Sequence, residues 1–109
     1  MKIAVAAQGN AVCSHFGHCE EFCLFDVEDG KVVRKFNVPN PGHEPGLLPR
    51  LLAEHGVDVV IAGGMGLRAQ QLFAQKNIRV VTGAWGPVEE AVTAYLNGSL
   101  ATGPNLCDH

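Results

Sequence analysis

The chain lacks any cluster of Lys and Arg, and it has few charged residues of either sign. Charged residues make up 17% of its 109 residues, and the formal net charge is −3 at pH 7. Proteins that bind nucleic acids neutralise runs of phosphates with clustered Lys and Arg side chains. A nucleic acid is therefore not expected as a partner.

Long hydrophobic runs are also missing. The apolar run that begins at Ile3 stops before Gln8, which is shorter than the roughly 7–15 residues of the apolar region of an export signal. No other stretch approaches the ~20 apolar residues that span a bilayer. We therefore expect a cytoplasmic protein that makes no membrane contact.

Nothing in the sequence divides the chain, because it has no internal repeat, no low-complexity tract and no linker. Apolar residues make up 47% of the chain, and this length is enough to bury one hydrophobic core but not two. We predict a single domain over residues 1–109. The four cysteines are expected to be thiols or metal ligands, because disulfides are rare in the cytosol.

Hydrophobic patterns predict an α/β fold. Short apolar runs indicate buried strands, and the Asp29-Gly30 pair between two such runs indicates an antiparallel hairpin. The predicted strands cover residues 3–7, 22–27, 31–38, 57–62 and 78–82. The predicted helices run from 47 to a stop at 56, through 69–76, and from 87 to a stop at 98. Because strands and helices alternate in the second half, parallel pairing with helices on both faces of the sheet is expected.

Four loops of this predicted fold belong to one edge of the sheet. They cover residues 8–20, 39–46, 63–66 and 83–87, and each lies at the carboxyl end of a strand or returns to that end. Open α/β sheets bind their ligands at this edge. We therefore expect the functional site where these four loops meet.

The first of these loops is dense in side chains that bind metals. Cys13, His15, His18 and Cys19 fall within seven residues, and thiolate and imidazole suit iron–sulfur, copper and zinc centres. His43 in the second loop is expected to approach the same edge. The spacing does not match that of a structural zinc site, which needs a second pair of ligands. An open site that receives a preassembled cluster fits the pattern better.

The remaining cysteines have simpler explanations. Cys23 alternates with Phe22 and Leu24 in a predicted strand, so we expect its thiol in the core. Cys107 and His109 follow the last predicted helix, from which the chain is long enough to return to the site. They are optional ligands, because chain ends are often frayed.

A glycine-rich turn precedes the second predicted helix. Gly64-Met65-Gly66-Leu67-Arg68-Ala69 follows a strand, but the acidic residue that binds ribose in a dinucleotide site is missing about 20 positions on. Free N–H groups at such a helix start favour an anion, although ordinary tight turns also explain the glycines. A small-anion or nucleotide-binding regulatory domain with structural cysteines therefore stays open as an alternative.

Several segments together resemble one protein family. Ser14-His15-Phe16-Gly17 after the first predicted strand is similar to its S-x-H-F-G signature, and residues 56–66, 83–91 and 95–98 are similar to its second half. The chain thus resembles the dinitrogenase iron–molybdenum cofactor biosynthesis family, which includes NifX-type carriers and the NifB C-terminal domain.

This resemblance implies a ribonuclease H-like three-layer α/β/α fold, with a mixed five-stranded sheet in the order 3-2-1-4-5 and an antiparallel second strand. It also implies a non-enzymatic carrier or scaffold for an iron–sulfur, iron–molybdenum or molybdenum–copper sulfide cluster, with cofactor donor or acceptor proteins as partners. Nuclease chemistry is not expected, because residues 2–7 lack the carboxylate that would bind Mg²⁺. The candidate cofactor-binding residues are Ser14, His15, Gly17, His18, Cys19, His43, Gly64 and Gly66. The candidate metal ligands are His15, His18, Cys19 and His43, with Cys107 and His109 as optional additions.

Overall fold

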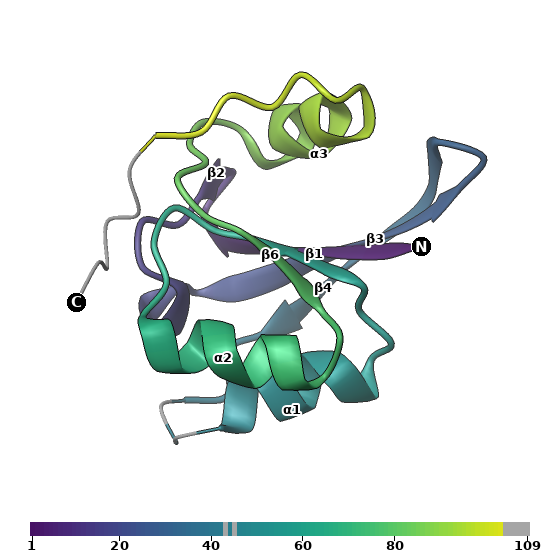
Figure 1. The fold of residues 1–109 in the computed structure, drawn as a ribbon. Helices are drawn as coiled ribbons and strands as arrows, with labels where there is room; N and C mark the ends of the chain where they lie inside the picture. Colours follow the sequence, from purple (N-terminus) through teal and green to yellow (C-terminus); the bar gives the residue numbers. More distant parts are fainter. Residues whose placement is uncertain (43, 45, 104–109) are drawn as a thin grey trace.

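The protein has three layers, with a mixed β-sheet between two layers of helix (Figure 1). The computed structural model describes residues 1–42, 44 and 46–103. Helix α3 (Val88–Leu96) covers one face of the sheet, whereas α1 (Leu47–Glu54) and α2 (Leu67–Gln75) cover the other. The predicted α/β fold is therefore confirmed. None of the described helices is long and apolar enough to cross a bilayer.

Within the described residues the sheet has six strands, one more than the sequence predicts. The strands are β1 (Lys2–Gln8), β2 (Ala11–Val12), β3 (Glu21–Glu28), β4 (Lys31–Pro39), β5 (Val59–Ile61) and β6 (Arg79–Val81). Five of them lie in the order β4-β3-β1-β5-β6, and β2 pairs with the end of β1. The β1–β5 and β5–β6 pairs are parallel, and the β1–β3 and β3–β4 pairs are antiparallel.

The prediction of a plain loop over residues 8–20 was wrong in two places. At Gly9, φ is +61°, and the chain turns back so that Val12 pairs with Ala7 and forms β2. A 3₁₀ helix, η1 (Phe16–His18), follows. Neither element is long enough to show a hydrophobic period, which is why the sequence pattern does not reveal them.

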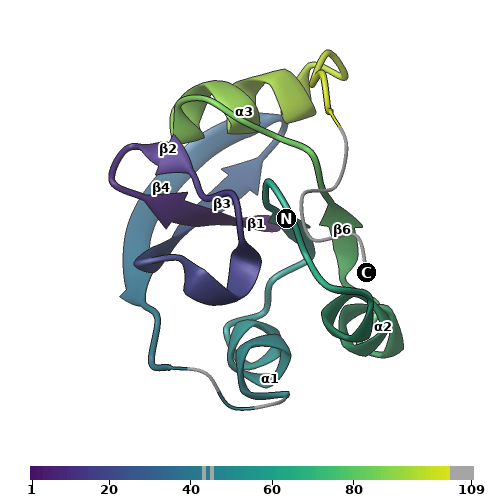
Figure 2. The same cartoon turned by 90° about the vertical axis from the view of Figure 1, so that its left-hand side faces the viewer.

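The core consists of two clusters, one on each face of the sheet. Strand β1 is buried on both faces, so its side chains alternate between the clusters. Ala4 and Ala6 face α1 and α2, whereas Ile3 and Val5 face α3. Figure 2 shows the sheet between these two helix layers. The short alanine side chains on the first face leave room for residues from the following loop, including Phe16.

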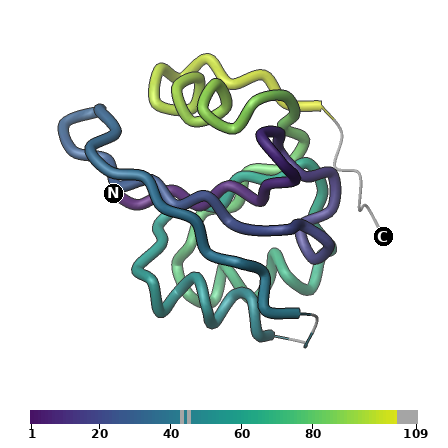
Figure 3. The backbone as a smooth tube through the Cα atoms, turned by 180° about the vertical axis from the view of Figure 1, so that it is seen from behind, coloured from purple at the N-terminus to yellow at the C-terminus, as the bar shows by residue number. Residues whose placement is uncertain are grey.

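The β3–β4 hairpin projects beyond the helices, as Figure 3 shows. Strand β4 is an edge strand, and Val33 on it is 56% exposed. The pairing of β3 with β4 shifts register between Asp26 and Val27. Such a bulge twists an edge strand and discourages pairing with another chain.

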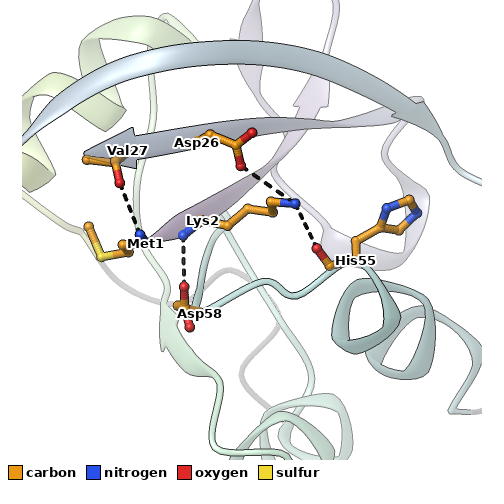
Figure 4. A network of polar contacts seen from close by, with 6 residues as sticks. All are labelled: Met1, Lys2, Asp26, Val27, His55 and Asp58. Atoms are coloured by element: carbon orange, nitrogen blue, oxygen red, sulfur yellow. Dashed lines mark hydrogen bonds and ion pairs between the residues drawn. The ribbon is translucent and has the colours of Figure 1, made fainter.

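A polar network ties down the amino-terminal end of β1 (Figure 4). The backbone N of Lys2 donates to Asp58 Oδ2 at 2.8 Å. The Lys2 Nζ donates to the His55 carbonyl at 2.9 Å and lies 3.6 Å from Asp26 Oδ1. The Met1 N donates to the Val27 carbonyl at 3.0 Å. These contacts join β1 to β3 and to the α1–β5 connection at the edge opposite the candidate site.

Candidate functional site

Four chain segments lie side by side at the carboxyl edge of the sheet, joined by backbone hydrogen bonds. The N–H of Gly63 donates to the carbonyl of Cys13 at 2.9 Å, and the N–H of Gly83 donates to the carbonyl of Gly63 at 2.7 Å. The N–H of Gly103 then donates to the carbonyl of Gly83 at 2.7 Å. The predicted meeting of the first, third and fourth loops at this edge is confirmed.

Close packing of the backbones requires glycine at positions 63 and 83. A Cβ on Gly63 would lie 2.8 Å from the carbonyl oxygen of Cys13 and 2.9 Å from the Cα of Ser14. At Gly83, φ is +80° and a Cβ would lie 2.0 Å from the Gly103 carbonyl oxygen. Only glycine allows the backbones to approach this closely. The segment that leads into His15 is therefore held directly against the segment after β5.

The chain after α3 returns to this edge. From the sequence alone, the chain is long enough for this return, but the return itself is not determined. Residues 99–103 bring Gly103 to the loop at Gly83, as Figure 1 shows for the segment after α3. The predicted optional ligands Cys107 and His109 lie outside the described residues, and so does His43.

A cavity of about 680 Å³ opens on the α1 and α2 side of this edge. Its first wall is the turn from His15 to His18, and its second wall contains Glu44 and Gly46 ahead of α1. Gly66 and Arg68 at the start of α2 form the third wall. The apolar part of its lining includes Phe16, Leu48, Pro49, Met65, Ala69 and Leu72. Volume and lining are those of a small-molecule site.

The two histidines lie on an anchored turn. The Phe16 side chain is 4% exposed and packs with its ring centroid 5.4 Å from those of Phe22 and Phe73. Its N–H donates to the Gly64 carbonyl at 2.9 Å. The exposed rings of His15 and His18 lie edge to face with centroids 6.2 Å apart. Phe16 therefore fixes the turn to the core, while the two imidazoles lie at the cavity rim.

The thiols of this region are buried beneath the turn. The Cys13 Sγ donates to the His15 carbonyl at 3.2 Å. Cys19 is 4% exposed and does not line the cavity, so it would have to turn outward to act as a ligand. Cys23 lies in the core, as predicted. Within residues 1–42, 44 and 46–103, no group of three or more His, Cys, Asp or Glu side chains is arranged to hold a metal ion.

The burial of Cys19 predicts that alkali destabilises the fold. Burial is the main cause that raises the pKa of Cys19 from 9.0 to about 12, and the nearby Cys13 adds to the shift. Between these pH values the unfolded chain loses a proton that the folded chain keeps. The free energy of unfolding should therefore fall as the pH rises from about 9 towards 12. Urea unfolding at several pH values in this window measures the slope.

Cys19→Ala is the matched variant for this prediction. It lacks the thiol, so its stability should fall less steeply over the same pH window than that of the unaltered chain. Alkylation at pH 8 followed by peptide mass mapping gives a second measurement, in which Cys19 should react only after unfolding. Equal pH slopes for the two chains would contradict the assignment of this effect to Cys19.

The other predicted site residues lie around the same turn. Ser14 is exposed beside His15, and Gly17 lines the cavity within η1. Gly64 is buried and contributes its carbonyl, whereas Gly66 directly precedes α2 at the cavity wall.

Sequence reasoning missed three residues that shape the site. Arg68 and Met65 line the cavity, and Asn40 bonds to the histidine turn. Arg68 lies in the first turn of a helix that follows a glycine-rich turn, which is a recognisable anion-binding context. Met65 and Asn40 give no such local signal, because their positions depend on contacts between distant segments.

Charge at the cavity is mixed. Arg68 lies on the α2 side and Glu44 on the α1 side, and both are exposed. The N–H groups at the start of α2 add partial positive charge beside Arg68. An anionic ligand is therefore favoured at the α2 wall and disfavoured near Glu44.

Comparison with known sequences identifies the class of protein. Residues 1–98 match the family described as "Dinitrogenase iron-molybdenum cofactor". The chain therefore belongs to the dinitrogenase iron–molybdenum cofactor family, as the sequence segments indicated. Membership in this family is consistent with a role in cofactor assembly.

Individual relatives cover nearly the whole chain. An uncharacterized protein of Methanocaldococcus jannaschii, MJ0580, is 30% identical over 105 residues, which cover 92% of this chain and 89% of the relative. The crystal structure of PH0822 superimposes with a TM-score of 0.91 at 31% identity and covers 97% of each chain. The apo form of the orange protein from Desulfovibrio gigas gives a TM-score of 0.79 at 26% identity, over 95% of this chain and 93% of the other.

Proposed function

We propose that this protein binds a sulfide-bridged metal cluster in the cavity beside His15 and His18 and passes it on during metallocofactor assembly. The observation that carries the proposal is the cavity itself, whose lining combines two exposed imidazoles with several apolar side chains. Imidazole nitrogens are good ligands for iron and copper. An apolar lining excludes water, which would otherwise compete for the metal and hydrolyse the sulfide.

The choice of cargo follows from the family and from the charge at the cavity. An iron–molybdenum or iron–sulfur cluster is the first candidate, and a molybdenum–copper sulfide cluster is the second. Such clusters carry negative charge, so Arg68 and the start of α2 support their binding. The order β4-β3-β1-β5-β6 with an antiparallel β3 supports the ribonuclease H-like class that the family resemblance implies.

The proposed role is carriage and not catalysis. The histidines lie at an open rim, where a cluster can enter and leave without opening the core. A carrier needs such reversible access, because a cofactor donor must load the cluster and an acceptor protein must take it. Loading and release would then depend on partner proteins that approach this edge.

Anaerobic reconstitution tests the proposal. The protein is incubated separately with iron, with iron plus molybdate and with copper plus molybdate, each in the presence of sulfide, and is then desalted. We expect charge-transfer absorption in the visible range and a fixed ratio of metal to chain by elemental analysis. A colourless, metal-free product in all three mixtures would contradict the proposal. Nucleotide binding by that metal-free protein would favour the alternative of a small-anion or nucleotide-binding domain.

A further inference from the structure

Asn40 joins the histidine turn of the cavity to the chain that follows β4. It directly follows β4 and precedes the loop that contains Glu44 and Gly46. Its side chain contacts two different segments of the chain. We propose that Asn40 is a positioning residue that fixes the histidine turn to the chain that follows β4.

One end of the Asn40 side chain holds the histidine turn. Its Nδ2 donates to the Cys19 carbonyl at 2.8 Å and to the Gly17 carbonyl at 3.3 Å. The Cys19 Sγ lies 3.8 Å from the same nitrogen. These two carbonyls belong to the end of η1 and to the residue after it. The amide therefore closes the turn that presents His15 and His18.

The other end of the side chain holds the backbone that follows β4. The Oδ1 of Asn40 accepts a hydrogen bond from the N–H of Gly42 at 3.0 Å. The backbone N–H of Asn40 also donates to the Glu20 carbonyl at 3.1 Å. Asn40 is thus fixed to the chain just after η1, and its side chain fixes the backbone at Gly42.

Only an amide fits both sets of contacts. The carbonyl groups of Gly17 and Cys19 need a donor, whereas the N–H of Gly42 needs an acceptor, and the asparagine side chain provides both. In Asn40→Asp the carboxylate keeps the acceptor for Gly42. It also puts negative charge against the carbonyl oxygens of Gly17 and Cys19, so the turn should be released while the bond to Gly42 remains.

Asn40→Asp, Asn40→Ala and Asn37→Asp are the variants for the test. Asn37 lies on β4. Its Nδ2 donates a hydrogen bond to the Oε1 of Glu21 at 3.3 Å, at the protein surface. Asn37→Asp therefore makes the same change of charge three residues away, without touching the turn. Asn40→Ala removes the amide without adding charge. Far-UV circular dichroism and urea unfolding establish that each variant folds.

The first readout is the imidazole ¹⁵N NMR spectrum of the apo proteins. Both Asn40 variants should shift or broaden the His15 and His18 signals and leave His55 unchanged, whereas Asn37→Asp should leave all three unchanged. The second readout is the affinity for tetrathiomolybdate, a compact sulfide-bearing anion. It should fall about tenfold or more in both Asn40 variants, and by no more than about twofold in Asn37→Asp.

The affinity readout rests on the proposed function, but the NMR readout does not. If the unaltered protein fails to bind tetrathiomolybdate or any reconstituted cluster, the proposed function fails, and the histidine signals alone decide the role of Asn40. Unchanged His15 and His18 signals in the Asn40 variants would overturn the proposal. Altered His15 and His18 signals with an unchanged affinity for tetrathiomolybdate in the Asn40 variants would also overturn it, because the turn geometry would then not control binding.

Discussion

Replacement of His15 by alanine is expected to weaken retention of a reconstituted cluster by about 10–100-fold. This range corresponds to the loss of one hydrogen bond or ligand contact to a charged group, which contributes about 1.5–3 kcal/mol. The effect should be large because the turn is anchored by Phe16, so His15 loses little further conformational freedom when it binds. Metal content after desalting and the rate of cluster loss to a chelator measure the effect.

His55→Ala is the matched control for this variant. His55 follows the end of α1 and does not line the cavity. Its carbonyl, which the alanine variant keeps, accepts the bond from Lys2 (Figure 4). The His55→Ala variant should retain the cluster as the unaltered chain does. A second comparison uses a chain that ends at Leu106, which lacks Cys107 and His109. If that chain loses its cluster while His15→Ala keeps it, the site lies at the tail and not at the turn.

Replacement of Gly83 by alanine is expected to destabilise the fold by roughly 2–5 kcal/mol. The left-handed conformation costs an alanine about 1–2 kcal/mol, and forcing a methyl group into a packed region costs about 1–3 kcal/mol. Here φ is +80° and the new Cβ would lie 2.0 Å from the carbonyl oxygen of Gly103. Urea unfolding followed by circular dichroism measures the loss.

Gly103→Ala tests the same contact from its other side. A Cβ on Gly103 would have its nearest neighbours at 3.8 and 3.9 Å, which is ordinary contact distance. This variant should therefore be as stable as the unaltered chain within about 0.5 kcal/mol. Equal stability of the Gly83 and Gly103 variants would show that the segment after α3 does not pack on Gly83 as described.

Much of the fold could be predicted because its elements carry their own local signals. The apolar run of β1, the turn between β3 and β4, and the spaced apolar residues of α3 each specify an element over a few residues. Alternation of strands and helices then requires parallel pairing in the second half. The gathering of loops at one edge follows from this topology, which is why His15 and His18 could be chosen as candidate site residues.

The internal order of that edge could not be predicted in the same way. Strand β2 and the turn at Phe16 are too short to show a hydrophobic period. In the sequence Cys19 looks like an available ligand, but in the folded chain its thiol is buried beneath the turn. The bonds from Asn40 to the histidine turn give no local signal, since the carbonyl groups that accept them lie more than 20 residues away. Such contacts depend on how segments pack and not on their individual preferences.

The sequence by itself determined the fold class, the family and the edge at which the candidate site lies, because hydrophobic period and turn residues act over short stretches of chain. The tertiary structure decided which groups are available at that edge. Backbone hydrogen bonds from Cys13 through Gly63 and Gly83 to Gly103 draw four distant segments together. Because close packing buries the thiols and leaves the imidazoles at the rim, only the folded chain distinguishes a core cysteine from a ligand.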